Sequence, residues 1–204
     1  KSIALISDAG TPLVSDPGYR LVPATPAAGI RVVPLPGACA AIVALSASGL
    51  PSDRFAFEGF PPVKSAARRT WFEALASGPR TLIVYESPHR IVESLQDMVA
   101  VFGAAREAVY ARELTKQFET VRHAALGELA HWVAEDANQQ RGEIVVLIHG
   151  AAPAVAETSE DAARILRILI KELPVSQAAA LAAEITGQKK NQLYELALQL
   201  KQAP

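Results

Sequence analysis

Carboxylates, hydroxyl groups, glycines and prolines are concentrated in residues 7–18, directly after the apolar run 3–6. Such a run is typical of a buried strand that delivers its end into a tight loop. The two glycines permit backbone conformations and close approaches that side chains forbid, and the two prolines stiffen the loop. The stretch therefore predicts either a cradle for a small molecule or a strand-to-helix connection capped by Asp16, because loops of this composition are common.

Three further loops with unusual polar content are predicted at residues 34–41, 86–90 and 112–119. Strand-like and helix-like segments alternate through the first 150 residues, which favours an α/β fold with a mostly parallel sheet and helices on both faces. Loops in such sheets gather at the carboxyl ends of the strands. We therefore expect residues 7–18 and these three loops to meet at one edge of the sheet.

The elements that position these loops are predicted from apolar runs and from Gly and Pro punctuation. Strands are predicted at residues 3–6, 30–33, 55–57, 81–85, 108–112 and 143–148. Helices are predicted at residues 38–48, from Pro88 to Phe102 with Ser87 as the N-cap, and near 126–135, with a short or kinked helix within 19–29. The predicted organisation is a first α/β domain at 1–53, a second at 54–150, a linker at 151–157 and a helical module at 158–204.

The helical module is predicted to contain three amphipathic helices, of which the second ends at Gly187. The third begins with the polar residues Lys189, Lys190 and Asn191. A helix, a glycine turn and a second helix with a polar start resemble a helix-turn-helix, which would contact nucleic acid. A plain helical hairpin is the alternative, because short amphipathic helices are common.

Composition restricts the class of protein. Hydrophobic residues make up 50% and charged residues 20% of the 204 residues, with a net charge of −1, as in an ordinary globular chain. No region is basic in bulk, so nucleic-acid binding would need a local cluster such as Lys64, Arg68 and Arg69. The single cysteine, Cys39, excludes an internal disulfide and fits a reducing cytoplasm. No apolar run approaches the roughly 20 residues of a membrane span, and the histidines lack the spacing of a metal site.

No Ser-His-Asp signature, P-loop or Gly-x-Gly-x-x-Gly fingerprint is present, so the residues alone predict a small-molecule site on an α/β scaffold. Several segments nevertheless occur together in a fixed order. They are SDAGTPLVSDPG at 7–18, Pro-Gly at 36–37, Gly-Phe at 59–60, YESPHR at 85–90, ARELTK at 111–116 with Glu119, and Gly-Glu at 142–143. In these segments the chain resembles the bacterial small-subunit rRNA (cytidine) 2′-O-ribose methyltransferases of the tetrapyrrole methylase superfamily, over essentially all its residues.

The resemblance implies two α/β domains, the first of them partial in this chain, with S-adenosylmethionine bound between them and a C-terminal helix-turn-helix-like module. It also implies a cytoplasmic homodimer that methylates a cytidine ribose in the decoding region of 16S rRNA in the 30S subunit, without a metal or a membrane. The residues that it assigns to the cofactor site are Asp8, Gly10, Thr11, Pro12, Ser15, Asp16, Gly37, Ala38, Cys39, Tyr85, Glu86, Ser87, Leu114 and Thr115.

The same resemblance implies that three basic side chains, Arg90, Arg112 and Lys116, face rRNA phosphates. Further candidates for RNA contact are Lys64, Arg68, Arg69, Lys189, Lys190 and Asn191. For each cation near a glutamate, a simple salt bridge is the alternative. A 2′-hydroxyl is a poor nucleophile at neutral pH, so a carboxylate within hydrogen-bond reach would help. The candidates for that base, left unranked, are Asp8, Asp16 and Glu113.

Two other functions stay open on the sequence. A methyltransferase of the same superfamily that acts on a tetrapyrrole or another small molecule would need neither a helix-turn-helix nor a basic cluster. A ligand-sensing regulator without catalysis would bind duplex DNA through Lys189, Lys190 and Asn191 and would transfer no methyl group.

The resemblance also leads to an expectation about cofactor affinity. The family begins with a further α/β segment that carries a Pro-Ile-Gly-Asn loop, and nothing in this sequence matches it. The cofactor cleft would then lack one wall, so we expect the 204-residue chain alone to bind S-adenosylmethionine weakly or not at all. Isothermal titration calorimetry measures this directly, and an affinity as high as that of a complete family member would contradict it.

Overall fold

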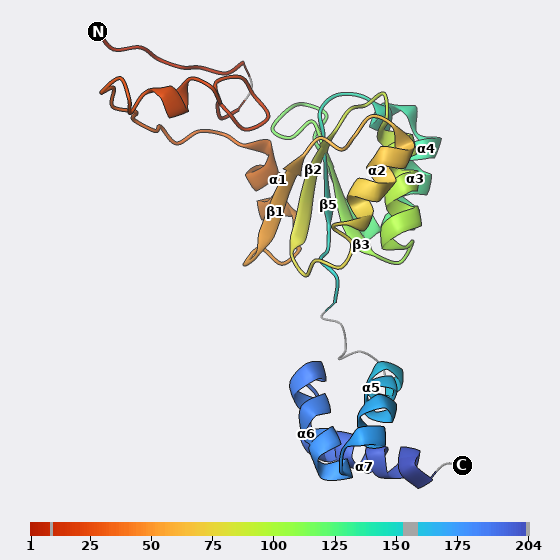
Figure 1. Cartoon of the computed structure of the whole chain (residues 1–204). Helices are drawn as coiled ribbons and strands as arrows, with labels where there is room; N and C mark the ends of the chain where they lie inside the picture. The colour runs from red at the N-terminus through yellow and green to blue at the C-terminus, as the bar shows by residue number, and fades with distance from the viewer. Residues whose placement is uncertain (9, 153–158, 203–204) are drawn as a thin grey trace. The chain divides into compact units, whose positions relative to one another are not determined.

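The computed structural model of the chain describes residues 1–8, 10–152 and 159–202. The chain forms two compact units, Lys1–Ala151 and Ala152–Pro204 (Figure 1), and each is described by itself. The division falls at the start of the predicted linker 151–157, most of which lies outside the described residues.

A five-stranded mixed sheet forms the centre of the first unit, in the order β1-β2-β5-β3-β4. The strands are β1 (Phe55–Gly59), β2 (Thr81–Glu86), β3 (Glu107–Arg112), β4 (Thr120–Ala125) and β5 (Ile144–Ile148). Only β1 and β2 pair in parallel, and the other three ladders are antiparallel. The prediction of a mostly parallel sheet was therefore wrong. The short connection between β3 and β4 returns the chain antiparallel, and β5 runs opposite to both strands that flank it.

Helices cover both faces of the sheet, as predicted (Figure 1). Side chains alternate along the strands, so Leu82 and Val84 of β2 face one core while Ile83 faces the other. The first core includes side chains of α2 (Ser65–Glu73), α3 (Ile91–Phe102) and α4 (Leu126–Glu135). The second is closed by α1 (Ala40–Ser48), whose alanines permit a close approach to β2 and β5. As predicted, α1 ends at a glycine, since Gly49 adopts φ +70°.

Residues 1–39 contain no strand among those that the structure describes. The strands predicted at 3–6 and 30–33 were wrong, and the Ile3 side chain is 93% exposed. An apolar run becomes a strand only where a neighbour pairs with its backbone amides and carbonyls, and the described part of the chain contains no strand paired with these segments. The short helix predicted within 19–29 is present as the 3₁₀ turn η1 (Val22–Ala24). The turn is short because Pro26, directly after its C-cap Thr25, has no amide to continue the hydrogen bonds.

The start of α3 also differs from the prediction. The helix begins at Ile91, and Ser87 does not cap it. Instead, the Ser87 hydroxyl accepts the His89 amide at 3.4 Å, and its carbonyl accepts the Arg90 amide at 3.0 Å. Residues 87–90 therefore form a separate turn between β2 and α3, which leaves their polar groups at the edge of the sheet.

The second unit contains the three predicted helices, α5 (Ser159–Glu172), α6 (Val175–Thr186) and α7 (Lys190–Gln202). Gly187 ends α6 with φ +69°, as predicted. The core is built from small residues and leucines, among them Leu166, Ala182 and Leu193. The N-cap predicted for α5 at 159–161 falls on side chains outside the described part of the chain.

A buried ion cluster ties α2 to α3 and corrects one predicted RNA contact. The Arg68 side chain is fully buried, and its Nη2 lies 2.6 Å from Asp97 Oδ2. Arg69 Nε donates to Asp97 Oδ1 at 2.6 Å, and the Ser65 hydroxyl donates to the same oxygen at 2.9 Å. Burial raises the pKa of Asp97, but the hydrogen bonds from Arg69, Ser65 and Arg68 outweigh it and hold the pKa below its usual value. Arg68 therefore acts inside the fold and does not face phosphate, whereas Arg69 and Lys64 remain exposed.

Replacement of Asp97 by alanine should lower the free energy of unfolding by about 3–5 kcal/mol, because it leaves the buried Arg68 guanidinium without its carboxylate. Urea denaturation followed by circular dichroism measures the loss. Glu93→Ala is the matched control, since Glu93 is 72% exposed and 3.8 Å from Arg68, and it should cost less than about 1 kcal/mol. Equal effects of the two substitutions would contradict the assignment.

The lowered pKa of Asp97 gives the same cluster a pH dependence. The carboxylate stabilises the fold above its unfolded pKa, and this contribution is lost as the pH falls through the lower folded pKa. In the Asp97→Ala variant the free energy of unfolding should therefore fall less steeply as the pH is lowered into the acid range. Glu93→Ala should leave this pH dependence nearly unchanged.

Candidate functional site

The loops at 86–90 and 112–119 meet at one edge of the sheet. Glu86 at the end of β2 and Arg112 at the end of β3 both lie opposite Ile144 at the start of β5. Because β5 is antiparallel to both strands, β2 and β3 run in the same direction and their carboxyl ends coincide. Gly59 ends β1 at the same edge, since β1 is parallel to β2. The structure thus brings these two predicted loops together.

Tyr85 joins this edge to the start of α1. The Ala41 amide donates to the Tyr85 hydroxyl oxygen at 3.0 Å, and the Cys39 thiol lies beside the same oxygen. Burial raises the pKa of Tyr85 to about 12, so the phenol stays neutral at physiological pH and keeps its O–H. The Phe57 and Phe60 rings pack edge-on against Tyr85, with centroids 4.7 Å and 5.7 Å away. The Tyr85 hydroxyl therefore links the predicted cofactor segments at 85–87 and 37–39.

The opening loop contacts the segment that leads into α1. The Thr11 hydroxyl donates to the Ala38 carbonyl at 2.9 Å. Gly10 has φ +95°, a backbone conformation that side chains disfavour, and a Cβ there would touch the same carbonyl at 3.4 Å. Leu13 and Ser15 also have positive φ, 74° and 59°. Such backbone strain in non-glycine residues is concentrated at functional sites.

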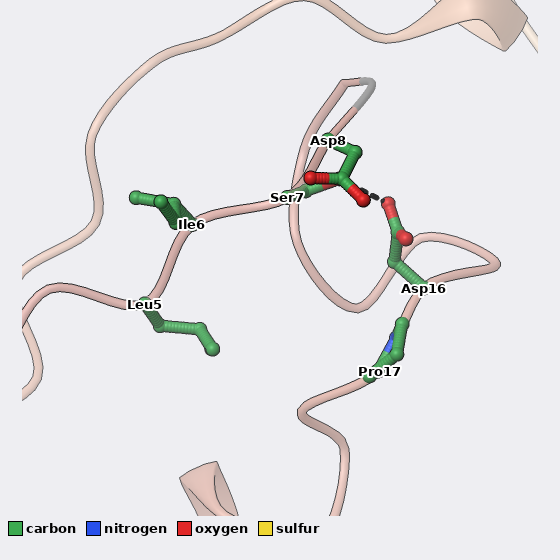
Figure 2. A pocket seen from close by; sticks show the side chains of 6 residues that line it. All are labelled: Leu5, Ile6, Ser7, Asp8, Asp16 and Pro17. Carbon is green, nitrogen blue, oxygen red and sulfur yellow. Dashed lines mark hydrogen bonds between the residues drawn. The ribbon is translucent and has the colours of Figure 1, made fainter.

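Residues of the opening loop line a small pocket of about 140 Å³ (Figure 2). The pocket is bordered by Leu5, Ile6, Ser7, Asp8, Asp16 and Pro17. The Ser7 hydroxyl donates to Asp16 and thereby closes the loop. Binding pockets for drug-sized ligands are about 300–1,000 Å³, so this pocket would hold only part of such a molecule.

Glu86 carries an unsatisfied buried oxygen at the sheet edge. Its Oε1 accepts the Ser87 amide and the Arg90 Nη2, each at 2.7 Å. Its Oε2 is buried and receives no hydrogen bond from any residue that the structure describes. A buried acceptor without a donor is costly, so Oε2 is suited to a ligand hydroxyl or amine. Arg90 forms the salt bridge that was the alternative to a phosphate contact.

The 113–119 loop is strained and tightly held. Glu113 and Thr115 have positive φ, 49° and 64°. The Glu113 Oε1 accepts Lys116 Nζ and the Glu143 amide, each at 2.9 Å, and Lys116 also contacts Glu143 Oε2 at 3.0 Å. The hydrogen bond from Lys116, followed by that from the Glu143 amide, lowers the pKa of Glu113. A carboxylate held in this way is a weaker proton acceptor than an ordinary glutamate.

Arg112 is buried and turned inward, which corrects its predicted exposure to phosphate. Its Nε donates to the Gln139 Oε1 at 3.2 Å, and its Nη2 donates to the Phe118 carbonyl at 3.1 Å and to the Thr120 hydroxyl at 3.4 Å. Gln139 lies in the 3₁₀ turn η2 (Ala137–Gln140). Sequence reasoning missed Gln139, because its 27-residue separation from Arg112 leaves no signal in the sequence.

A family model for tetrapyrrole (corrin/porphyrin) methylases matches residues 1–130, which include all the loops at this sheet edge except Gly142–Glu143. The chain belongs to the tetrapyrrole methylases. A second family model, described as the RsmI C-terminal HTH domain, matches residues 156–201. The three-helix unit of this methylase is thus a helix-turn-helix domain, as predicted.

Curated relatives cover nearly all of this methylase chain. "Ribosomal RNA small subunit methyltransferase I" of Pseudomonas aeruginosa is 61% identical over 201 residues, which cover 98% of the chain and 71% of that relative. The protein of the same name from Escherichia coli O157:H7 is 57% identical over 199 residues, 98% of the chain and 70% of the relative. The chain therefore spans about 70% of their length.

Among solved structures, the chain is similar to that of the methyltransferase CobJ, with a TM-score of 0.52. The match covers 70% of this chain and 62% of the CobJ chain. The sequence identity is 21%, so this likeness supports the fold alone.

Most predicted cofactor residues of the methylase lie in the converging segments. Leu114 packs against the core under α1, and Ser87 lies in the turn after β2. The remaining predicted positions, Pro12, Gly37 and Thr115, lie in the opening loop, before α1 and in the 113–119 loop. Lys189, Lys190 and Asn191 are exposed at the start of α7 in the other unit. Neither a metal-binding cluster nor a helix long and apolar enough to cross a membrane is found in the described parts of the chain.

Gly142 should be sensitive to substitution because the Glu113 carboxylate occupies the space where a Cβ would lie. Gly142→Ala should destabilise the protein by at least about 1 kcal/mol more than Gly49→Ala. Gly49 is the matched control: its φ of +70° is close to the +77° of Gly142, and no atom lies within 4 Å of its added Cβ. Thermal and urea denaturation of both variants measure the difference, and indistinguishable losses would contradict the overlap.

Proposed function

We propose that the protein transfers the methyl group of S-adenosylmethionine to the 2′-hydroxyl of a cytidine ribose in 16S rRNA. The observation that carries the proposal is the 61% identity, over 98% of the chain, to a protein named ribosomal RNA small subunit methyltransferase I. The helix-turn-helix family match at 156–201 adds support, because a nucleic-acid substrate gives such a domain a role.

Two groups at this edge of the sheet fit an adenosyl cofactor. Glu86 Oε2 is a buried acceptor suited to a ribose hydroxyl, and the Tyr85 ring with its aromatic neighbours offers an apolar surface to a planar base. We assign the cofactor site to the residues predicted for it, which lie in the segments 7–18, 37–39, 85–87 and 114–115. Bound there, S-adenosylmethionine supplies an electrophilic methyl group on a sulfonium.

The main task of the protein in this reaction is alignment. A rigid site that orients the ribose hydroxyl toward the methyl carbon lowers the barrier by several kcal/mol, as an order of magnitude. The network of Lys116, Glu113 and Glu143 fixes one wall of the site. These contacts lower the pKa of Glu113, which weakens it as a base, and Asp8 and Asp16 of the opening loop remain the other candidates to accept the hydroxyl proton.

The remaining features of the proposal follow from the resemblance to the family. They are the decoding region of 16S rRNA within the 30S subunit as substrate, a homodimer and a cytoplasmic location. Lys64, Arg69 and Lys116 keep exposed cationic groups on the first unit, and Lys189 and Lys190 on the second, so these side chains are the candidates for phosphate contact. Arg68 and Arg112 are excluded from that role by their burial.

The assay that tests the proposal is methyl transfer from tritiated S-adenosylmethionine to purified 30S subunits from a strain that lacks the modification, with the protein in full length. We expect label in 16S rRNA, at a ribose, and none in 30S subunits from the parent strain, in which the same ribose is already methylated. An absence of label in rRNA would refute the proposal.

The same assay distinguishes the other functions. Labelling of a tetrapyrrole in place of rRNA would favour a small-molecule methyltransferase. Specific binding of duplex DNA through α7 without any methyl transfer would favour a regulator.

A further inference from the structure

Phe118 presents an exposed aromatic ring from a rigid backbone. The residue is 65% exposed, yet its carbonyl accepts a hydrogen bond from the buried Arg112 guanidinium at 3.1 Å. On either side of it, the Glu119 carboxylate accepts the Thr115 amide at 2.6 Å, and the Glu119 amide donates to the Lys116 carbonyl at 3.2 Å. An exposed phenylalanine on a mobile loop would need no explanation. Here the buried Arg112 and the closed turn fix the backbone that carries the Phe118 ring.

Arg112 holds this ring indirectly. Its side chain spans from Gln139 to Phe118 and Thr120, and it is buried on the side of the sheet that carries α4. The Gln139 amide is fixed in turn by the Asp136 carboxylate at 2.9 Å. A charged group enclosed in this way does not neutralise phosphate, so we regard Arg112 as a positioning residue for the backbone of Phe118.

Phe118 also belongs to the loop that carries two of the predicted cofactor residues. Only a few residues separate it from Leu114 and Thr115, and Lys116 carries an exposed ammonium group in the same turn. Salt bridges in this unit pair Arg68, Arg69, Arg90 and Lys116 with carboxylates, and the chain as a whole has a net charge of −1. Contacts to phosphates position a protein on a nucleic acid but do not select a nucleotide, so contacts to bases have to contribute.

We propose that the Phe118 ring stacks on an unpaired nucleobase of the RNA substrate and thereby positions the target nucleotide. The proposal rests on the proposed function. Proteins recognise single-stranded RNA by stacking splayed bases on aromatic side chains, and loss of one such contact weakens binding by about 5- to 150-fold. Because the backbone that carries the ring is already held, the loop itself loses little conformational freedom on binding.

The experiment compares Phe118→Ala, Phe118→Leu and Phe118→Trp in the full-length protein. Affinity for unmodified 30S subunits is measured by sedimentation, and affinity for S-adenosylmethionine by calorimetry. Phe55→Ala is the matched control, because Phe55 is 38% exposed and lies at the start of β1, at the opposite edge of the sheet. Denaturation curves verify that every variant is folded.

We expect Phe118→Ala and Phe118→Leu to weaken 30S binding by about 5- to 150-fold, with Phe118→Trp near wild type and Phe55→Ala unchanged. The loss should be similar at every salt concentration, because stacking releases no counterions. S-adenosylmethionine affinity should stay constant. Retention of binding by Phe118→Leu would indicate an aliphatic contact and overturn the proposal, as would a parallel loss of cofactor affinity, which would place adenine on the ring.

Separate measurements of 30S binding and of methyl transfer distinguish a failure of the stacking proposal from a failure of the proposed function. If the wild-type protein binds 30S subunits with a dependence on the aromatic ring but transfers no methyl group, the proposed function fails and the stacking contact stands. If methyl transfer is normal in the wild type and in Phe118→Ala alike, with unchanged 30S affinity, the stacking contact fails alone.

Discussion

The placement of β5 between β2 and β3 is the constraint on which the first unit depends. All residues of β5, Ile144–Ile148, are buried, and the strand hydrogen-bonds on both sides. Its register sets Glu86 and Arg112 opposite the same residue, Ile144. A slip of one residue would exchange the side chains of β5 between the two cores and disturb the fit of both, so the packing of the two cores holds the register. The alignment of the 86–90 and 112–119 loops is thus a consequence of core packing.

Charged groups near this edge divide into two sets with different tasks. Arg68 and Arg112 are buried, and they fix α3 and the 113–119 loop: Arg68 pairs with Asp97, and Arg112 donates to Gln139 and to the Phe118 carbonyl. Lys116 is partly exposed and joins Glu113 to Glu143. The interior set gives the site rigidity, while the exposed cations stay accessible to a polyanion. Residue type alone does not distinguish the two sets, because both consist of basic residues near predicted loops.

Sequence reasoning identified elements whose signals are local. The glycine that ends α1 and the one that ends α6 were predicted, as were the core strands β2, β3 and β5, whose apolar runs are continuous. The strand β4 was missed because Arg122 and His123 interrupt its apolar pattern, and residues 3–6 were assigned a strand because a run of apolar residues does not reveal whether a partner exists. The pairs Arg68–Asp97 and Thr11–Ala38 join residues 29 and 27 positions apart, which spacing cannot predict. The sequence predicted the loops of the site, but only the structure shows which of their basic side chains are buried and which are exposed.

The sheet order also bears on how the chain acquires its structure. β5 is the last strand in sequence but occupies the middle of the sheet. Until residue 148 has been synthesised, β2 and β3 each expose an unpaired edge, and unpaired edges are templates for aggregation. Folding of this unit during translation therefore cannot be completed from the N-terminus onward. The β3–β4 hairpin and the β1–β2 pair can join only when β5 is available. Before that point the chain is exposed to aggregation through the unpaired edges of β2 and β3.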